Sequence, residues 1–531
     1  MKKLYSILIL IMLVSSTKAQ VSKTVNVSVA GTLSSILSAS QKQTITNLKL
    51  TGTINAKDFA EIQFYLIVLQ ELDLSSVSIA AYQGPGGPVG ATKTDIYPVN
   101  EIPMSAFHDY TEQKNNKILK SIILPTNLIS IGDLAFKDCD SLKNVIIPTA
   151  VTKIGSESFR NCESISSIIF SNTVTSIGSN CFDGCSNLSY VSIGTGLSNI
   201  SNYVFNNCVK LKSIIIPSNI KSIDNYAFNS CGFNSISIPI SITNIGSYAF
   251  GNNPCIKELI IPSSVSKIGD YAFSNCDSLK VVSFYNSVTG SYGFYDCDRI
   301  NKINFYSNST TINDYSFYSC DSIIDIDVND KVISIGNYSF KNCSKVKNVS
   351  IGNNVKTIGS SAFENCSNLQ NLIIGSGITT IGGSAFNGCI TIKTIHSKMN
   401  IPIEASAYSY FFSTNLQFWN CNLYVPIGTK TLYQNAKEWE NFANIFEELT
   451  AISTVDVLNI NIKVDRSKNN IIINELPDNN MDLDMFSSTG KLILKKIISN
   501  NNQISIDEIP NGIYIIYIHN KDNHATAKII I

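Results

Sequence analysis

The segment Leu211-Lys212-Ser213-Ile214-Ile215-Ile216-Pro217 begins a pattern that continues through Ile220 and Ile223 and ends at Ala227-Phe228, just before Cys231. The same order of residue types recurs from about residue 119 to residue 390. A fixed period of 21 to 23 residues is typical of a solenoid, in which each unit buries its apolar side only against its neighbours. We therefore predict twelve regular coils, numbered 1 to 12 after the residues Phe136, Phe159, Phe182, Phe205, Phe228, Phe250, Phe273, Phe294, Phe317, Phe340, Phe363 and Phe386.

Each coil contains two sets of apolar residues. After the Phe they stand at positions +6, +9 and +11, and the last two alternate as in a strand. Before the Phe a second pair stands at −8 and −5, for example Val355 and Ile358. We predict two short extended segments per coil, paired with those of neighbouring coils, and hence a mainly β fold.

A Gly follows the Ile at position −5 in most coils, and we predict a turn there that needs a permissive backbone. The pattern weakens in coils 8 and 9. Asn313 replaces this Gly, and Ser309 replaces an apolar residue. Compared with the other coils, two residues are missing between Val288 and Gly290. A kink or an altered surface is expected there.

The amino terminus has the three regions of a secretory signal peptide: Met1-Lys2-Lys3, an apolar run from Leu4 to Val14, and small residues ending at Ala19. We predict cleavage between Ala19 and Gln20. The apolar run is short for a membrane span, so the mature chain is expected to have none.

Residues 20–118 are predicted to form an amino-terminal cap with degenerate coils, because terminal coils lack one neighbour. The segments 48–59 and 69–75 are atypical coils, and the segment around Phe107 is a degenerate copy of the repeat. The Gly- and Pro-rich segment Tyr82–Pro88 is predicted to be an inserted loop. It is either simply solvated or in contact with a ligand.

The Leu-Thr-Gly-Thr-Ile-Asn-Ala-Lys-Asp-Phe segment (50–59), the Leu-Asp-Leu-Ser segment (72–75) and the repeated Ile-Pro, Ile-Gly, Ala-Phe and Cys columns resemble the BspA-like, or Treponema pallidum type, leucine-rich repeat proteins. The resemblance covers about residues 45–445, because residues 422–442 resemble the cap that ends such arrays. It implies a leucine-rich repeat solenoid, display outside the cell, and adhesion to host or neighbouring-cell macromolecules. It does not imply a particular ligand.

After residue 449 the repeat stops, and alternating segments at 471–473, 481–496, 503–506 and 513–518 predict a small antiparallel β-sandwich. Met485–Lys491, Ile509–Tyr514 and Lys528–Ile531 resemble the type IX secretion sorting domain. This resemblance implies the type IX secretion machinery as a partner and export across the outer membrane of a member of the Bacteroidota. A Pro-Asn-Pro near the start, common in that family, is missing.

Composition argues against several function classes. The chain has 40 basic and 40 acidic residues and no cluster of Lys and Arg, so nucleic acid is not expected as a partner. The four His residues have no metal-ligand spacing, and no catalytic or phosphate-binding motif is present. We therefore predict that the protein is not an enzyme and needs no cofactor or metal.

Twelve of the fourteen Cys residues follow the repeat, and eleven stand three residues after the Phe. Asn253 occupies this position in coil 6. Neighbouring Cα atoms in such a column would be about 5 Å apart, so disulfides are sterically allowed. Parallel stacking points the Cβ atoms the same way, which favours buried free thiols. Disulfides and metal ligation remain alternatives, and Cys181 and Cys421 stay unexplained.

An aromatic column stands two residues before the Phe and marks the candidate binding residues. Seven rings could stack on one another and stabilise the turns, or they could present a flat amphipathic stripe to a protein or glycan. Tyr285 and Tyr306 add aromatic side chains at the irregular coils, where we expect a ligand if one binds. The column consists of Tyr203, Tyr226, Tyr248, Tyr271, Tyr292, Tyr315 and Tyr338.

The predicted chain thus has a signal peptide (1–19), an amino-terminal cap (20–118), a regular array (119–394), a carboxyl-terminal cap (395–449) and a β-sandwich sorting domain (453–531). We expect a secreted or outer-membrane-attached adhesin that binds an extracellular protein or glycan. The alternative is a self-associating structural component of the cell surface or biofilm.

Overall fold

The computed structural model describes residues 20–90, 92–108, 118–286, 288–307, 310–405, 410–413, 415–448, 461–465, 470–474, 481–487, 491–499, 502–510, 513–519 and 524–530. The predicted signal peptide lies outside these residues, as does Ala19 at its predicted cleavage site.

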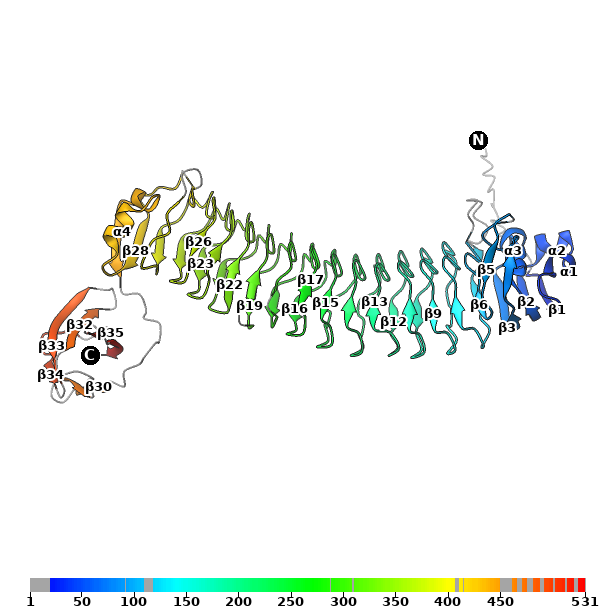
Figure 1. Ribbon diagram of the computed structural model, residues 1–531, viewed down its shortest axis with the longest axis horizontal. Helices are drawn as coiled ribbons and strands as arrows, with labels where there is room; N and C mark the ends of the chain where they lie inside the picture. Colours follow the sequence, from blue (N-terminus) through cyan, green and yellow to red (C-terminus); the bar gives the residue numbers. More distant parts are fainter. Residues whose placement is uncertain are drawn as a thin grey trace, which may run out of the picture.

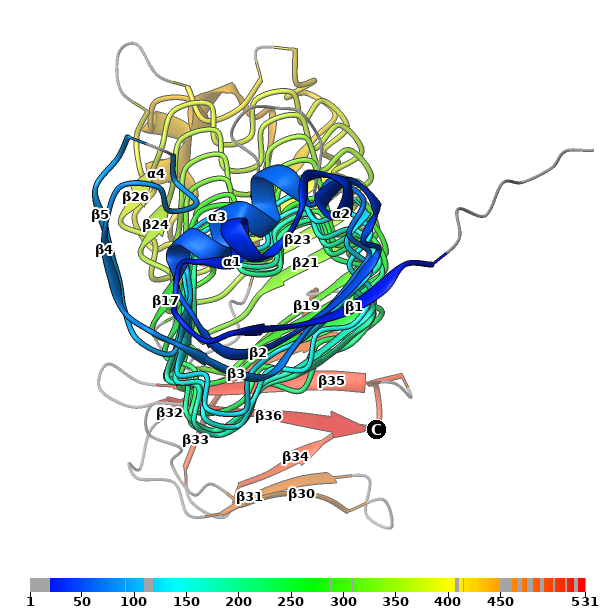
Figure 2. The same ribbon diagram turned by 90° about the vertical axis from the view of Figure 1, so that its right-hand side faces the viewer.

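The chain forms a long rod of stacked coils that is followed by a small β-domain (Figure 1). Seen along the rod, the outlines of successive coils nearly superimpose over the amino-terminal half (Figure 2). The rod then bends, beginning near the irregular coils (Figure 1). The prediction of a mainly β solenoid with coils of about 23 residues is confirmed.

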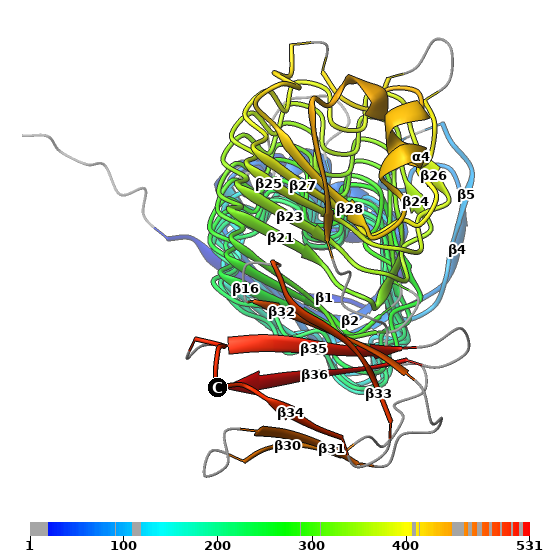
Figure 3. The ribbon, with the colours of Figure 1, turned by 90° about the vertical axis from the view of Figure 1, so that its left-hand side faces the viewer.

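One side of the rod is a row of parallel strands, which we call the main sheet. Most strands pair with the strand one coil further along, as in the register Ile326, Val349, Leu372 and Ile395, and the pairing is interrupted after β7, β12 and β19. A bridge between Ser192 and Ile215 continues the row into coil 4. Figure 3 shows its carboxyl-terminal strands side by side. The strands are β1 (Ser22–Val27), β2 (Asn47–Ile54), β3 (Glu71–Ile79), β7 (Ser121–Ile123), β10 (Ser167–Ile169), β12 (Tyr190–Ser192), β16 (Glu258–Ile261), β18 (Val281–Phe284), β19 (Lys302–Phe305), β21 (Asp325–Val328), β23 (Asn348–Ile351), β25 (Asn371–Ile374), β27 (Thr394–Ser397), β28 (Asn422–Pro426) and β29 (Asn444–Glu448).

A second row of shorter parallel strands contains the Ile at position −5, as the two-segment prediction requires. Its strands are β6 (Glu101–Ile102), β8 (Ser130–Ile131), β9 (Lys153–Ile154), β11 (Ser176–Ile177), β13 (Asn199–Ile200), β14 (Ser222–Ile223), β15 (Asn244–Ile245), β17 (Lys267–Ile268), β20 (Thr310–Ile312), β22 (Val332–Ile335), β24 (Thr357–Ile358) and β26 (Thr380–Ile381).

The repeated Phe residues form one continuous buried stack between these rows. Successive ring centroids lie 5.0 to 5.8 Å apart with nearly parallel planes. The stack begins at Phe107 and ends at Phe412, beyond both ends of the regular array. The segment around Phe107 is therefore packed as a copy of the repeat.

The Cys column consists of buried free thiols. Each thiol donates to the carbonyl of the Phe in the preceding coil, for example Cys208 Sγ to Phe182 O at 3.3 Å. Asn253 replaces Cys in coil 6, and its Nδ2 donates to Phe228 O at 2.9 Å. Since Asn can substitute for Cys there, the column works as a row of hydrogen-bond donors to a buried backbone.

The two cysteines that the repeat left unexplained are also buried. Cys181 stands at position −1, a column of small residues, with its Sγ 3.1 Å from the hydroxyl of Ser158. Burial raises the pKa of both Cys181 and Cys421 to about 12.

The repeated Gly has a different role from the predicted one. None of these glycines at position −4 in coils 1, 2, 3, 6, 7, 10, 11 and 12 has a positive φ. Instead, a Cβ added to Gly178 would lie 2.3 Å from the backbone N of Ser156 in the preceding coil. Gly is thus required by close approach of two backbones, and the permissive-backbone explanation is wrong.

The irregular coils 8 and 9 contain a buried polar cluster in place of apolar packing. The Thr289 hydroxyl lies 2.7 Å from that of Ser316 and accepts from the backbone N–H of Asn313 at 2.9 Å. Gly290 adopts φ 78° in this region. The sequence predicted a kink or an altered surface at these coils, and it did not predict this buried hydrogen-bonded network.

Helices and a hairpin occur at the ends of the rod. The amino-terminal cap contains α1 (Leu33–Ile36), α2 (Ala39–Thr44) and α3 (Ala56–Tyr65), which the prediction of atypical coils missed. The predicted loop at Tyr82–Pro88 begins an antiparallel hairpin, β4 (Tyr82–Gly84) with β5 (Asp95–Tyr97). At the other end lie α4 (Lys430–Asn435) and the 3₁₀ helix η2 (Trp439–Asn441).

The carboxyl-terminal domain has two antiparallel sheets, in the orders β30-β31-β34 and β33-β32-β35-β36. One cluster of buried side chains, including Ile473, Leu483 and Ile516, contains residues from both sheets. The predicted segment 481–496 is a pair of strands rather than one. The strands are β30 (Asn461–Asp465), β31 (Asn470–Asn474), β32 (Met481–Ser487), β33 (Leu492–Ile498), β34 (Asn502–Ser505), β35 (Ile513–His519) and β36 (His524–Ile530).

Gly178→Ala is expected to lower the unfolding midpoint in urea, because its Cβ would meet backbone at 2.3 Å and such overpacking costs about 1–3 kcal/mol. Ser201→Ala is the matched control. Ser201 stands in the same column and already has a Cβ, so the change removes only its 2.6 Å hydrogen bond to Ile177 O, worth about 1 kcal/mol. Equal losses in both variants would contradict the close-approach explanation.

Thiol labelling of the native chain is expected to modify one cysteine out of fourteen. Cys255 is exposed and all the others are buried, and thiols with raised pKa values react slowly. Labelling with a maleimide, counted by mass spectrometry before and after denaturation, should give one and then fourteen additions. Fewer than fourteen after denaturation without reductant would show disulfides instead.

Candidate functional site

The seven predicted Tyr residues form a continuous stack along coils 4 to 10. Their ring centroids lie 4.2 to 4.8 Å apart, and successive planes differ by 5° to 16°. All seven side chains are half-buried. The predicted column is therefore brought together as one row, which we call the Tyr row.

Each Tyr in this row has a left-handed backbone, with φ between 51° and 58°. This conformation lets its N–H donate to a carbonyl in the next coil, for example Tyr203 N to Asn225 O at 3.0 Å. A left-handed bulky residue costs about 1–2 kcal/mol, and an aromatic pair returns about 0.5–1.5 kcal/mol. The two effects are similar in size, so stacking offsets the strain of the turn.

The ring faces inside the Tyr row are already used. Tyr226, Tyr248, Tyr271, Tyr292 and Tyr315 each have a neighbouring ring on both sides. At the carboxyl end, Lys341 Nζ lies 5.2 Å from the ring centroid of Tyr338. The stripe is thus a row of ring edges and hydroxyls, and the flat stacking surface that the sequence suggested is not available to a ligand.

Interactions between neighbouring hydroxyls connect the middle of the row. Those of Tyr271, Tyr292 and Tyr315 interact with one another along the row. Burial, followed by the charge of neighbouring phenolates, raises the pKa of Tyr226, and burial is also the main cause for Tyr271 and Tyr292. These three phenols therefore stay neutral at physiological pH and can both donate and accept hydrogen bonds.

Other aromatic residues near coils 7 to 9 fall into two groups. Tyr295 and Tyr318 stack at 5.3 Å, and Tyr295 packs edge-on against Tyr271, which widens the Tyr row. Tyr285 and Tyr306, two of the predicted candidates, stack on each other at 4.6 Å and are exposed. Each follows the last residue of its strand, β18 or β19 of the main sheet, and the two form a pair separate from the Tyr row.

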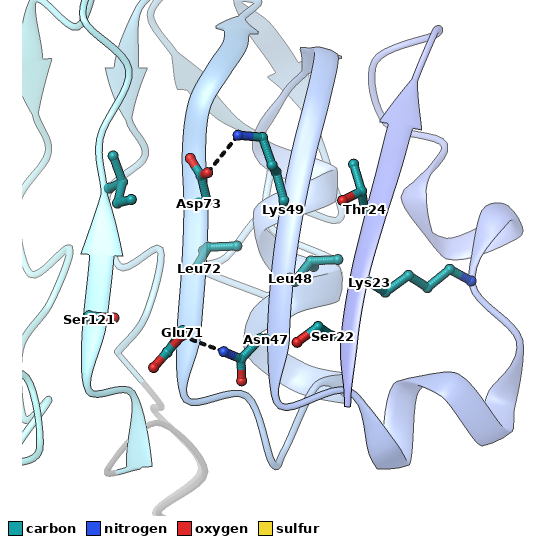
Figure 4. A pocket seen from close by; sticks show the side chains of 11 residues that line it. Ser22, Lys23, Thr24, Asn47, Leu48, Lys49, Glu71, Leu72, Asp73 and Ser121 are labelled. Atoms are coloured by element: carbon teal, nitrogen blue, oxygen red, sulfur yellow. Dashed lines mark hydrogen bonds and ion pairs between the residues drawn. The ribbon is translucent and has the colours of Figure 1, made fainter. Parts of the chain in front are cut away.

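Sequence reasoning missed a shallow hollow of about 340 Å³ on the outward face of β1, β2, β3 and β7. Figure 4 shows Lys49 paired with Asp73 and Asn47 with Glu71 across neighbouring strands. Burial would raise the pKa of Asp73, but hydrogen bonds from Lys49 and Ser75 lower it overall. The spacing Asn-x-Lys and Glu-x-Asp was the available signal, because alternate strand residues share a face.

The main sheet also has an outward column of exposed Ile residues that sequence reasoning did not single out. Ile146 and Ile215 are 84% and 86% exposed. They are the middle residues of Val-Ile-Ile and Ile-Ile-Ile segments, so alternation along the strand was the signal. This outward Ile column consists of Ile123, Ile146, Ile169, Ile215 and Ile260.

Within the residues that the structure describes, no group of three or more His, Cys, Asp and Glu side chains is arranged to hold a metal ion. Over the same residues, none of the helices combines the length and apolar character needed to cross a membrane.

Tyr292→Asn is expected to destabilise the rod, although Asn tolerates a left-handed backbone better than Tyr. It removes ring pairs at 4.5 and 4.2 Å, together worth about 1–3 kcal/mol. Tyr292→Phe retains the rings and should unfold near the wild-type urea concentration. If the Asn variant were as stable as the wild type, stacking would not be what holds the row.

Comparison with known proteins identifies two regions. The BspA type leucine-rich repeat region matches residues 100–232, 198–323 and 310–438. The secretion system C-terminal sorting domain matches residues 454–531. The sorting domain indicates type IX secretion and attachment to the outer cell surface, as predicted.

A solved structure at 27% identity has the same fold. A leucine-rich repeat protein from Bacteroides ovatus is 27% identical, with a TM-score of 0.55, and the alignment covers 66% of this chain and 83% of that one. A leucine-rich cell surface protein from Faecalibacterium prausnitzii is 26% identical over 58% and 86% of the two chains, with a TM-score of 0.37. A search of the curated proteins finds no match. Since the repeat matches together span residues 100–438, more than half of the 531 residues, the chain belongs to the BspA-type leucine-rich repeat family.

Proposed function

We propose that the chain is an adhesin that binds an extracellular protein or glycan through the Tyr row. Its sorting domain places a long solenoid at the cell surface, where a row of rigid side chains meets other cells and matrix. The leader is cut between Ala19 and Gln20 in this proposal, and the type IX machinery is the partner in export.

The observation that carries the proposal is the arrangement of the phenol hydroxyls. They are carried by stacked rings, whose centroids lie 4.2 to 4.8 Å apart and whose packing restricts rotation. A binding group that is held rigid before association loses little conformational entropy when a partner binds. Tyr is also enriched at protein interfaces, where one ring supplies both apolar contact and a hydrogen bond.

The groups that the Tyr row exposes indicate what kind of partner would bind it. With the inner ring faces covered, contact runs through edges and hydroxyls, which suits an extended polymer rich in hydroxyl, amide or carbonyl groups. Tyr285 and Tyr306 supply a second exposed pair beside the irregular coils. They are the place where such a partner would gain additional apolar contact.

A structural component that associates with itself is the second candidate. The outward Ile column favours it, because an exposed apolar row of this length is unusual on a monomer. The net charge of zero also leaves copies of the chain without strong mutual repulsion.

The test is a binding screen of the chain from Gln20 to Ile531 against purified extracellular-matrix proteins and glycans. Replacing Tyr271, Tyr292 and Tyr315 together by Phe keeps the stack and removes three hydroxyls. We expect at least tenfold weaker binding to whichever array component binds the wild type, measured by surface plasmon resonance.

Tyr65→Phe is the control, because Tyr65 is 53% exposed on helix α3 and lies outside the row. Unchanged binding by the triple variant would exclude the Tyr row as the site. A folded chain that binds no component of the array would count against the adhesin and favour the structural candidate.

A further inference from the structure

The outward face of the main sheet has a regular alternation in coils 2 to 7. At the same strand position stand, in order, Ile169, Ser192, Ile215, Ser237, Ile260 and Ser283. The three Ile side chains are 60%, 86% and 60% exposed. Each of these six residues is flanked along the chain by apolar residues that pack inward, such as Ile214 and Ile216 around Ile215. The face is therefore a row of projecting Ile side chains separated by small Ser side chains.

We propose that this Ile/Ser row is the interface of a homodimer, in which two copies of the chain pack antiparallel with a twofold axis between coils 4 and 5. The axis pairs coil 4 of one copy with coil 5 of the other, coil 3 with coil 6, and coil 2 with coil 7. Each pairing sets an Ile against a Ser: Ile215 with Ser237, Ile260 with Ser192, and Ile169 with Ser283.

The repeat length argues for a second copy as the occupant. Projecting and small residues alternate every second coil, about 9.6 Å at roughly 4.8 Å per coil. A partner must show the complementary alternation with the same spacing over six coils. The row itself has this property when it is reversed, because it starts with Ile and ends with Ser. Isologous contacts require this kind of self-complementarity.

The charged residues beside the Ile/Ser row are compatible with the same antiparallel pairing. Exposed lysines stand three residues before the outward residue in coils 4, 6 and 7, where like charges face to face would oppose association. In the proposed register Lys212 meets Asn234, Lys257 meets Ser189, and Lys280 meets Ser166. The register also sets the hydroxyl of Tyr190 against the carboxylate of Glu258, both of which are exposed. No lysine faces another lysine.

The shape of the rod sets the extent of the interface. Coils 2 to 6 lie in the straight part of the rod in Figure 1, so two copies can keep one register along the row. From coil 8 the outward position becomes polar, with Asn304 and then Asp327. An isologous contact closes at two copies, so this interface makes a dimer and not a filament. It uses neither the Tyr row nor its hydroxyls.

Sedimentation velocity of the chain from Gln20 to Ile531 tests the association. The wild type should form a dimer at micromolar concentration, and Ile215→Asp should remain monomeric, because it puts a charge at the centre of the interface. Ile96→Asp is the matched control. Ile96 is 74% exposed but lies on the hairpin strand β5, so this variant should dimerise like the wild type. A monomeric wild type, or equal loss in both variants, would overturn the proposal.

Cross-linking tests the register independently. In a Cys255→Ser background, which removes the exposed native thiol, Ile169→Cys chains are mixed with Ser283→Cys chains and treated with a short bismaleimide. A covalent dimer is expected in the mixture and not with either variant alone, because residue 169 lies about five coils from its own copy in the partner. Mixing Ile169→Cys with Asp327→Cys, two coils out of register, should give little product. Equal yields in the two mixtures would contradict the antiparallel pairing.

Discussion

The structure depends on hydrogen bonds between backbone groups of adjacent coils at the turn that carries the Phe. In coil 4 the N–H groups of Tyr203, Phe205 and Asn207 donate to carbonyls of coil 5 at 2.9 to 3.0 Å. Tyr203 and Asn207 can do so only with left-handed backbones, at φ 58°. No coil can satisfy these groups by itself, so each requires its neighbours, and the side-chain columns follow from this one geometry.

Each column of repeated side chains has one structural role in that geometry. The Phe stack fills the space between two rows of strands. The Cys thiols donate to carbonyls that the turn leaves buried, and Asn253 shows that the donor matters more than the sulfur. Asn is frequent two residues after the Phe, where it tolerates the left-handed backbone and bonds to its counterpart one coil away, as Asn275 Nδ2 does to Asn252 Oδ1 at 2.8 Å. A residue type recurs every 23 residues because each coil has the same space to fill, the same buried carbonyl and the same left-handed positions.

The sequence predicted those features that depend on burial. Apolar periodicity located both strand rows and the Phe stack, since a residue that must be buried in every coil leaves a visible column. Features that depend on backbone conformation were not predictable in this way. The close approach at Gly178 and the left-handed turn at Tyr203 follow from the path of the chain, and residue type alone does not separate a Gly required by space from one required by φ. The helix α3 was missed because the cap does not follow the repeat.

The candidate surfaces also combine features that were visible in the sequence with features that only the structure shows. The Tyr row was visible as a column, yet the orientation of its rings decides what it can bind, and stacking leaves edges and hydroxyls at the surface. The outward Ile column was overlooked because Ile fits the expected core composition, and only strand alternation separates Ile215 from its buried neighbours. In a solenoid the outward-facing positions repeat from coil to coil in the same way as the buried positions. Any contact made by one coil is therefore available to the next, and modest interactions along either row add up to a specific partner.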